Sequence, residues 1–226
     1  MFSFSVAIKE TDLFILAEKN LSEQAKKAAQ NCREIIEKYI KQKPSFLTNL
    51  APIPFDPFAP PIIASMICAA QKTNVGPMAA VAGAVAEFVG QELLKHCSQV
   101  IIENGGDIFL KSSKKRIIRI QDEKSSFNNK IALQIEADQS PLGICTSSGT
   151  VGHSLSFGRA DAVVVLSPYT ALADAAATAI GNIIQTKDDV NPALEKAKTI
   201  KGITGVVIIK NDQAGFWGEV KIIETS

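Results

Sequence analysis

The chain has 226 residues, of which 46% are hydrophobic and 21% charged, and its formal net charge is +1. This composition is typical of a globular protein with a sizeable core and excludes a disordered chain. A charge so close to zero gives no general attraction to nucleic acid, and no apolar run is long enough to cross a bilayer, so we expect neither nucleic acid nor membrane as a partner.

The first elements in chain order are a hairpin and a helix. Residues 3–8 and 13–17 are apolar stretches around a polar turn, which favours a β-hairpin over a secretory signal and predicts a cytoplasmic protein. Apolar residues then recur at helical spacing from a cap at Asn20 or Ser22 to about Lys43.

A proline-rich connection and two small-residue helices follow. Residues 44–61 contain six of the ten prolines, so we expect neither helix nor strand there. Residues 61–72 and 77–96 are rich in alanine and other small residues. We expect these two segments to be helices that pack closely in the interior.

The second half is mostly strand. Short apolar or alternating runs predict strands at residues 100–102, 108–110, 116–120, 131–135 and 162–166. Two helices are expected, over about 171–184 and 191–198. Residues 205–209 and 219–223 should close the chain as a hairpin across Asn211-Asp212. The pattern predicts one α+β domain over residues 1–226, with antiparallel or mixed sheets packed against small-residue helices.

The cysteines form no CxxC pair, which argues against a zinc knuckle. Cys32, Cys68 and Cys97 fall in helical patterns and are expected to be small core residues. Cys145 differs, because it lies where a strand opens into a loop of serine, threonine and glycine.

A glycine-rich turn follows an apolar strand, in the order Asn104, Gly105, Gly106 and Asp107. Two glycines permit positive φ angles and let a ligand approach bare backbone, while the flanking side chains offer polar contacts. The same four residues are typical of a β-bulge or tight hairpin without a ligand. Both interpretations stay open at this point.

A run of hydroxyl-bearing and small residues begins with Thr146, Ser147, Ser148 and Gly149. Backbone amides and hydroxyls in such a run can hold phosphate oxygens. The run lacks the lysine of a P-loop and the GxGxxG of a dinucleotide fold. Cys145 or Ser147 could alternatively act as a nucleophile with His153 as its base, although the spacing fixes no geometry.

The most informative segment is the alanine-rich helix that holds Asp174 and Thr178. A spacing of four places the carboxylate and the hydroxyl on one face, one turn apart. Two oxygen donors in such bare surroundings suit a hard cation such as Mg²⁺. The alternative is a close-packed helix in which Asp174 is a first-turn residue stabilised by the helix dipole.

The order of these motifs resembles the ApbE family, the FAD:protein FMN transferases. That family shows an N-x-GGD-type turn, a TSG loop and an ADAxAT helix in this order. The chain is most similar to the ApbE-like branch of small soluble proteins, over segments that cover nearly its whole length: residues 75–83, 103–107, 147–154 and 173–182.

The resemblance implies a site for FAD, a small-molecule nucleotide, with a Mg²⁺ ion on its pyrophosphate. Asp174 and Thr178 would supply oxygens to the metal, and residues 104–107 and 146–149 would line the flavin site. Asp174, Cys145 and His153 are the candidate catalytic residues. The implied reaction is attack of a hydroxyl of a protein substrate on the FMN phosphorus, with AMP leaving.

Some family features are missing from this chain. It lacks the N-terminal Met-Gly-Thr stretch, a lipoprotein signal and the His-Ile-Ile-Asp-Pro segment, in whose place residues 152–158 read GHSLSFG. Flavin binding without transfer, or cleavage of the FAD pyrophosphate, are therefore included in the hypothesis. The rival hypothesis is a thiol or persulfide sulfur carrier, or an accessory protein, in anaerobic sulfur assimilation and homocysteine formation, a role that the resemblance to the ApbE-like branch implies. Cys145, with His153 near it in the sequence, motivates this hypothesis. A structural partner protein that has kept only the fold is a third possibility. Separately, the small-residue helices favour close self-association, so a homo-oligomer is expected as a possible partner state.

Overall fold

The computed structural model describes residues 1–120, 125, 127, 130–147 and 158–225. Among these residues, eight strands form one sheet in the order β1-β2-β3-β4-β7-β8-β9-β10 and three form another in the order β11-β6-β5. The larger sheet comprises β1 (Phe2–Ile8), β2 (Thr11–Ala17), β3 (Val100–Asn104), β4 (Asp107–Lys111), β7 (Leu142–Ser147), β8 (Ala162–Ser167), β9 (Gly205–Lys210) and β10 (Gln213–Gly218). The smaller one comprises β5 (Arg116–Arg119), β6 (Ile131–Ile135) and β11 (Ile222–Glu224).

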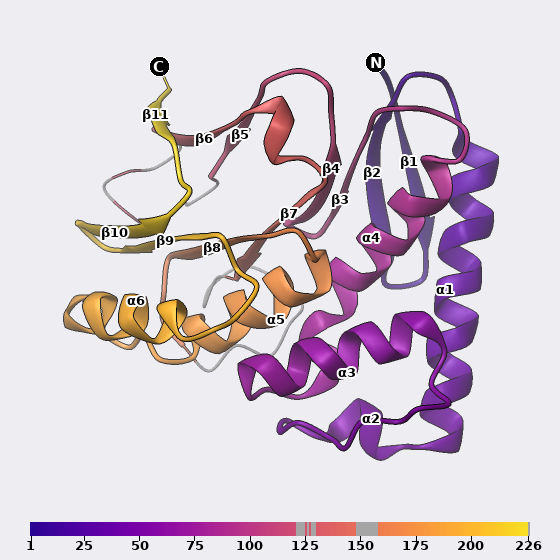
Figure 1. Ribbon diagram of the computed structural model, residues 1–226, viewed down its shortest axis with the longest axis horizontal. Helices are drawn as coiled ribbons and strands as arrows, with labels where there is room; N and C mark the ends of the chain where they lie inside the picture. The colour runs from indigo at the N-terminus through magenta and orange to yellow at the C-terminus, as the bar shows by residue number, and fades with distance from the viewer. Residues whose placement is uncertain (121–124, 126, 128–129, 148–157, 226) are drawn as a thin grey trace.

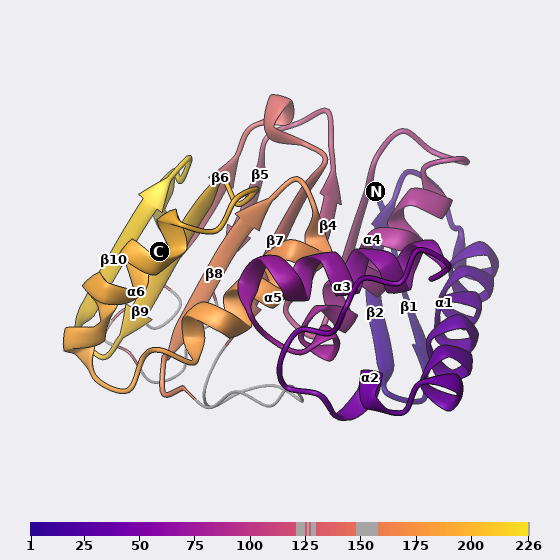
Figure 2. The ribbon, with the colours of Figure 1, turned by 60° about the horizontal axis from the view of Figure 1, so that its bottom comes forward.

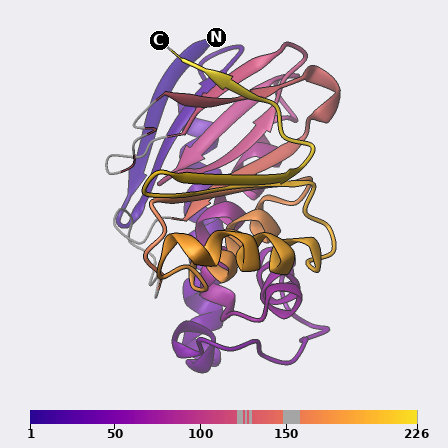
Figure 3. The same cartoon turned by 90° about the vertical axis from the view of Figure 1, so that its left-hand side faces the viewer.

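The helices gather on one face of the larger sheet, and the smaller sheet covers part of the other face (Figures 1 and 3). The α-helices are α1 (Ser22–Gln42), α2 (Ser45–Thr48), α3 (Pro61–Thr73), α4 (Val81–Leu93), α5 (Thr170–Gly181) and α6 (Val190–Lys198). The 3₁₀ turns are η1 (Pro77–Ala80), η2 (Ala137–Gln139) and η3 (Lys187–Asp189). Strand pairing between named strands is antiparallel throughout the described ranges, which confirms an α+β fold.

Two hydrophobic cores lie on the two faces of β8. Val163 and Val165 point into the core on the helix side, whereas Val164 and Leu166 belong to the core under the smaller sheet. Successive side chains of a strand point to opposite faces, so a strand covered on both sides must be apolar at every position. This explains the continuous apolar run that predicts β8 from the sequence.

Helix α5 is the most enclosed helix, and every residue in it except Ala179 is buried. It lies over β7 and β8 and is flanked by α3 and α4 (Figure 2). Its alanines leave little side-chain bulk, so the sheet and two helices approach it closely. None of the described helices is both long and apolar enough to pass through a bilayer.

Three sequence expectations need correction. The connection before α3, where we expected neither helix nor strand, contains the short helix α2. Pro44 precedes α2, because proline can begin a helix as well as end one. Phe46 of α2 is buried in the core, where its ring contacts Tyr39. The segment expected to be one helix over 77–96 begins as the 3₁₀ turn η1 and its α-helix ends at Leu93.

The third correction concerns the closing hairpin. Strand β9 pairs with residues 213–218 and not with 219–223, and Ile222 and Ile223 pair instead with β6. Strand β10 contains glycines, which weakened its strand signal. Gly215 is needed there because an added Cβ would lie 2.8 Å from side-chain atoms of Leu194 and Val190 in α6.

The tight contact of α4 with the sheet gives a first prediction. Gly90 faces Phe109 of β4, and an added Cβ would lie 2.2 Å from the ring. Alanine is the better helix former by about 1 kcal/mol, but overpacking of a core costs about 1–3 kcal/mol. We therefore expect Gly90→Ala to lower the free energy of unfolding in chemical denaturation.

The matched control is Gly181→Ala in α5, where the nearest atom is the movable hydroxyl of Ser147 at 3.3 Å. Its effect should be smaller. A Gly90→Ala protein as stable as the parent would contradict the packing of α4 on β4.

Candidate functional site

The glycine-rich turn is a two-residue hairpin between β3 and β4. Asn104 and Asp107 are cross-strand partners, and Gly105 and Gly106 have φ angles of 63° and 98°. Positive φ at both central positions is typical of a type I′ turn, which glycine adopts without strain. The tight-hairpin interpretation is thus confirmed. It does not exclude a ligand, because Gly105 is exposed and a Cβ there would meet no atom within 4 Å.

The hairpin is attached to the first turn of α4. Asn104 is buried, and its Nδ2 donates a hydrogen bond of 3.0 Å to the backbone oxygen of Ala82. The next residue of α4, Gly83, donates its backbone N–H to Oδ2 of Asp174 at 2.8 Å. The start of α4 therefore connects two motifs that lie about 70 residues apart in the sequence.

Asp174 and Thr178 lie one turn apart in α5, as predicted, and both are buried, each with 6% of its surface exposed. Asp174 is the fifth residue of this helix, so it belongs to the second turn. The interpretation of Asp174 as a first-turn residue stabilised by the helix dipole is therefore wrong. Its partner is instead the N-terminal turn of a different helix.

Asp107 is a second buried carboxyl beside Asp174. Burial raises the pKa of Asp107 well above its usual value, and the negative charge of Asp174 raises it further. Burial also raises the pKa of Asp174, to about 7, while the amides of Gly83 and Ala82 partly oppose this rise. Among described residues, Asp107 Oδ1 and Thr170 Oγ1 are the buried side-chain oxygens without a hydrogen-bond partner.

These residues fit a hard cation. Two carboxyls that are expensive to ionise, one with a free buried oxygen, would be stabilised by a divalent charge, and Thr178 adds a hydroxyl. In the described part of the chain, no group of three His, Cys, Asp or Glu side chains could hold a metal by itself. Mg²⁺ commonly takes one or two carboxylates and completes its shell with water and substrate phosphates.

Cys145 lies in the same region, as the cross-strand partner of Asp107 on β7. It is fully buried, and its thiol donates to the backbone oxygen of Thr170 at 3.4 Å. Burial and the charges of Asp107 and Asp174 raise the pKa of the thiol well above its usual value. This environment opposes a thiolate and anchors the start of α5 to the sheet.

The remaining predicted residues divide into two groups. Thr146 and Ser147 are half-buried at the end of β7. Ser148, Gly149 and His153 lie outside the described residues, so the phosphate-loop and nucleophile predictions that use them stay predictions. The expectation that Cys68 is a core residue is wrong, since it is exposed on α3.

Glu87 is a residue of this region that sequence reasoning missed. It is buried on α4, and its Oε2 accepts hydrogen bonds from the amides of Thr170 at 2.7 Å and Ala171 at 3.3 Å. A single carboxylate inside an otherwise apolar helical run is the signal that could have found it, because buried acids need partners.

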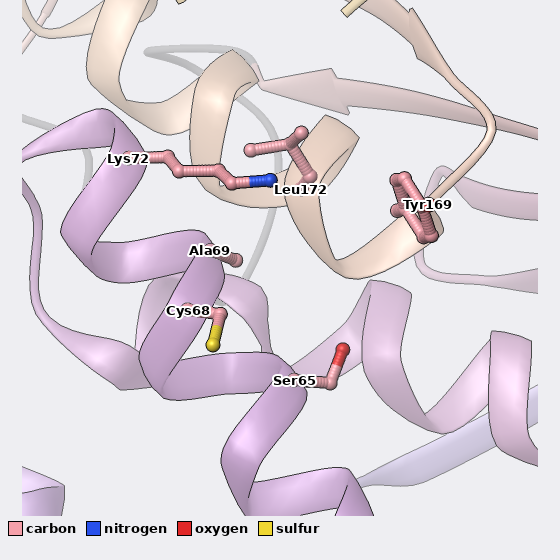
Figure 4. Close-up of a pocket in the computed structure, with 6 residues that line it drawn as sticks. All are labelled: Ser65, Cys68, Ala69, Lys72, Tyr169 and Leu172. Atoms are coloured by element: carbon pink, nitrogen blue, oxygen red, sulfur yellow. The ribbon is translucent and has the colours of Figure 1, made fainter. Parts of the chain in front are cut away.

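A separate cavity of about 190 Å³ lies between α3 and the start of α5 (Figure 4). It is lined by Ser65, Cys68, Ala69, Lys72, Tyr169 and Leu172. The Nζ of Lys72 lies 5.8 Å from the centre of the Tyr169 ring. No predicted site residue lines this cavity.

Comparison with known proteins gives consistent results over almost the whole chain. The model of a family described as AbpE bacteria matches residues 2–216. A UPF0280 protein of Methanocaldococcus jannaschii is 39% identical over 97% of this chain and 91% of its own length. A UPF0280 protein of Methanosarcina acetivorans is 37% identical over 94% of this chain and 85% of its own length.

Solved structures share the fold at low sequence identity. The flavin transferase ApbE from Vibrio cholerae superposes with a TM-score of 0.58 at 13% identity, over 100% of this chain and 97% of that one. The apo flavinyl transferase ApbE of Pseudomonas stutzeri gives a TM-score of 0.60 at 11% identity, over 96% and 94% of the two chains.

The buried Asp174 predicts a pH dependence of stability. Between pH 3.8 and about 7 the folded protein keeps a proton that the unfolded chain has released, so the free energy of unfolding falls as the pH rises. The pKa values of Asp107 and Glu87 are also raised by burial, so these groups contribute to the same slope. We therefore expect Asp174→Asn, which can still accept the Gly83 amide, to reduce this slope in denaturation experiments without metal.

Saturating Mg²⁺ should flatten the slope of the parent protein as well, because a cation stabilises the charged carboxylate. Asp212→Asn, in the exposed β9–β10 turn, is the control and should keep the parent slope. Parallel slopes for the parent and Asp174→Asn would contradict the raised pKa.

Thiol labelling of the folded protein gives a further prediction. We expect iodoacetamide to modify exposed Cys68 first and Cys145 last, since Cys145 is buried and its pKa is raised. Mass spectrometry of peptides after timed labelling measures the order, and urea-unfolded protein, in which all four thiols should react, is the control. Labelling of Cys145 as fast as Cys68 would support the sulfur-carrier hypothesis.

Proposed function

This chain belongs to the AbpE bacteria family, and on that premise we propose that it binds FAD together with Mg²⁺. The site is built from the β3–β4 hairpin, the first turn of α4 and the Asp174 face of α5. We further propose that it transfers FMN to a protein hydroxyl or cleaves the FAD pyrophosphate. Structural neighbours named flavin transferases support this proposal through their shared fold.

The observation that carries the proposal is the buried pair of Asp107 and Asp174. Burial of two carboxyls disfavours their charged forms unless a positive charge lies beside them. Asp107 Oδ1 has no hydrogen-bond partner, so it can accept a cation without breaking an existing contact. The exposed glycine hairpin next to this pair lets a bulky ligand approach the backbone.

Each residue has a distinct role in the proposed chemistry. When bound, Mg²⁺ would neutralise charge on the pyrophosphate oxygens and so make AMP a better leaving group. Asp174 and Thr178 would hold the cation, with Asp107 as the second carboxylate. The hairpin amides and the end of β7 would orient the nucleotide. A protein hydroxyl as the attacking group yields a phosphoester, whereas water yields FMN and AMP.

The sulfur-carrier hypothesis depends on Cys145, and no contact in the described region favours it over flavin binding. A persulfide carrier needs an accessible thiolate, whereas this thiol is buried and donates to a backbone oxygen. Its test is the labelling experiment described above. A cytoplasmic location, a protein substrate and self-association stay predictions.

Flavin titration tests the proposal. We expect the parent protein to bind FAD in the presence of Mg²⁺, as measured by a change in flavin fluorescence. Removal of the metal with EDTA should weaken this binding strongly. Asp174→Asn should lower the affinity by about tenfold or more, because a charged ligand to the cation is lost. Thr178→Val, which replaces the hydroxyl by a methyl group of similar size, should weaken binding less.

The surface variant Asp212→Asn serves as the control and should bind as the parent does. Chromatographic detection of AMP then separates binding from turnover. The proposal fails if the parent protein does not bind FAD in Mg²⁺, or if Asp174→Asn binds equally well.

A further inference from the structure

Helix α5 obtains its N-terminal cap from another helix. Thr170 and Ala171 are its first two residues, and their amides have no acceptor within the helix. Tyr169, at the N-cap position, makes no side-chain cap. Both amides donate instead to Oε2 of Glu87 on α4.

The first turn of α4 is capped in return by α5. Gly83 is the third residue of α4, and its amide likewise lacks an acceptor within its own helix. Oδ2 of Asp174 accepts this amide. Each helix thus supplies a buried carboxylate that caps the start of the other.

The two contacts fix the position of α5 along its axis. Gly83 and Glu87 are four residues apart on α4, and Asp174 and Thr170 are four residues apart on α5, in reversed order. A Cβ on Gly83 would lie 2.6 Å from the backbone oxygen of Thr170 and 2.8 Å from Cβ of Asp174. The helices can therefore make both contacts only at this separation.

We propose that Glu87 is a positioning residue of the nucleotide and cation site, which holds α5 in the register that places Asp174 beside Asp107 of the β3–β4 hairpin. This inference rests on the proposed function. A serine or aspartate at position 169 would cap α5 wherever the helix lay. A cap from α4 stabilises α5 only when α5 lies at this position relative to α4. The Glu87 contact therefore fixes the position of α5 as well as stabilising its first turn.

The test compares Glu87→Ala and Glu87→Gln with Glu92→Ala, a half-buried control on the same helix that pairs with Lys95. The first measurement is hydrogen exchange at the Gly83 amide, in the absence of metal and flavin. The second is the Mg²⁺ concentration at half-maximal FAD binding. In Glu87→Ala, loss of the cap should speed exchange of the Gly83 amide and raise the Mg²⁺ concentration needed for half-maximal FAD binding, each by about tenfold. Glu87→Gln keeps an acceptor oxygen, so its Gly83 exchange rate and its Mg²⁺ requirement should both stay close to the parent values.

A double variant separates position from simple capping. The third measurement is the midpoint of thermal unfolding, which Glu87→Ala should lower. Adding Tyr169→Ser to Glu87→Ala gives α5 a local cap, so the thermal midpoint should return toward the parent value. Gly83 exchange and the Mg²⁺ requirement should remain as in Glu87→Ala alone. Recovery of all three values would overturn the proposal, as would unchanged Gly83 exchange in Glu87→Ala. Lack of Mg²⁺-dependent FAD binding by the parent overturns the proposed function instead, and the two failures are thereby distinguished.

Discussion

The close contact between α4 and α5 is the constraint on which the rest of the site depends. Glycine at position 83 lets the helix backbones approach, and two buried carboxylates satisfy the amides that this approach would otherwise leave without acceptors. An unsatisfied buried amide costs about 1–3 kcal/mol. The contact therefore excludes many small displacements of α5, and Asp174 is held in a defined place relative to Asn104 and Asp107.

Under the proposed function, the same contact would give Asp174 two tasks with opposing requirements. As a cap it must keep an acceptor oxygen toward Gly83, and its burial there raises its pKa to about 7. As a cation ligand it must be ionised. A divalent ion would reconcile the two, since its charge offsets the burial of Asp107 and Asp174 while the amide bond to Gly83 remains.

Local sequence patterns predicted the parts of the fold that depend on local physics. The glycine pair indicated a β-bulge or tight hairpin, and the structure has the hairpin, because glycine accepts positive φ at both central positions. The spacing of Asp174 and Thr178 predicted their common helix face. Continuous apolar residues gave β8. These features are set by residues close together in the chain.

Features set by partners far apart in the chain were missed. Glu87 caps a helix that starts 83 residues later, and nothing near Glu87 specifies that acceptor role. The position of Asp174 within α5 was predicted wrongly for a related reason. The first amides of α5 are accepted by a carboxylate of α4, so no local cap residue marks where this helix begins. Strand β10 was missed because the close packing of α6 requires glycine at position 215, and glycine has a low strand propensity.

The pairing of β11 with β6 has a consequence for synthesis of the chain. Strand β6 ends at Ile135, but its partner begins at Ile222, almost 90 residues later. On the ribosome the three-stranded layer cannot be completed until that last strand has emerged. Until then the apolar side chains that β8 and β9 turn toward this layer lack part of their cover, and exposed apolar surface of this kind favours aggregation of incomplete chains.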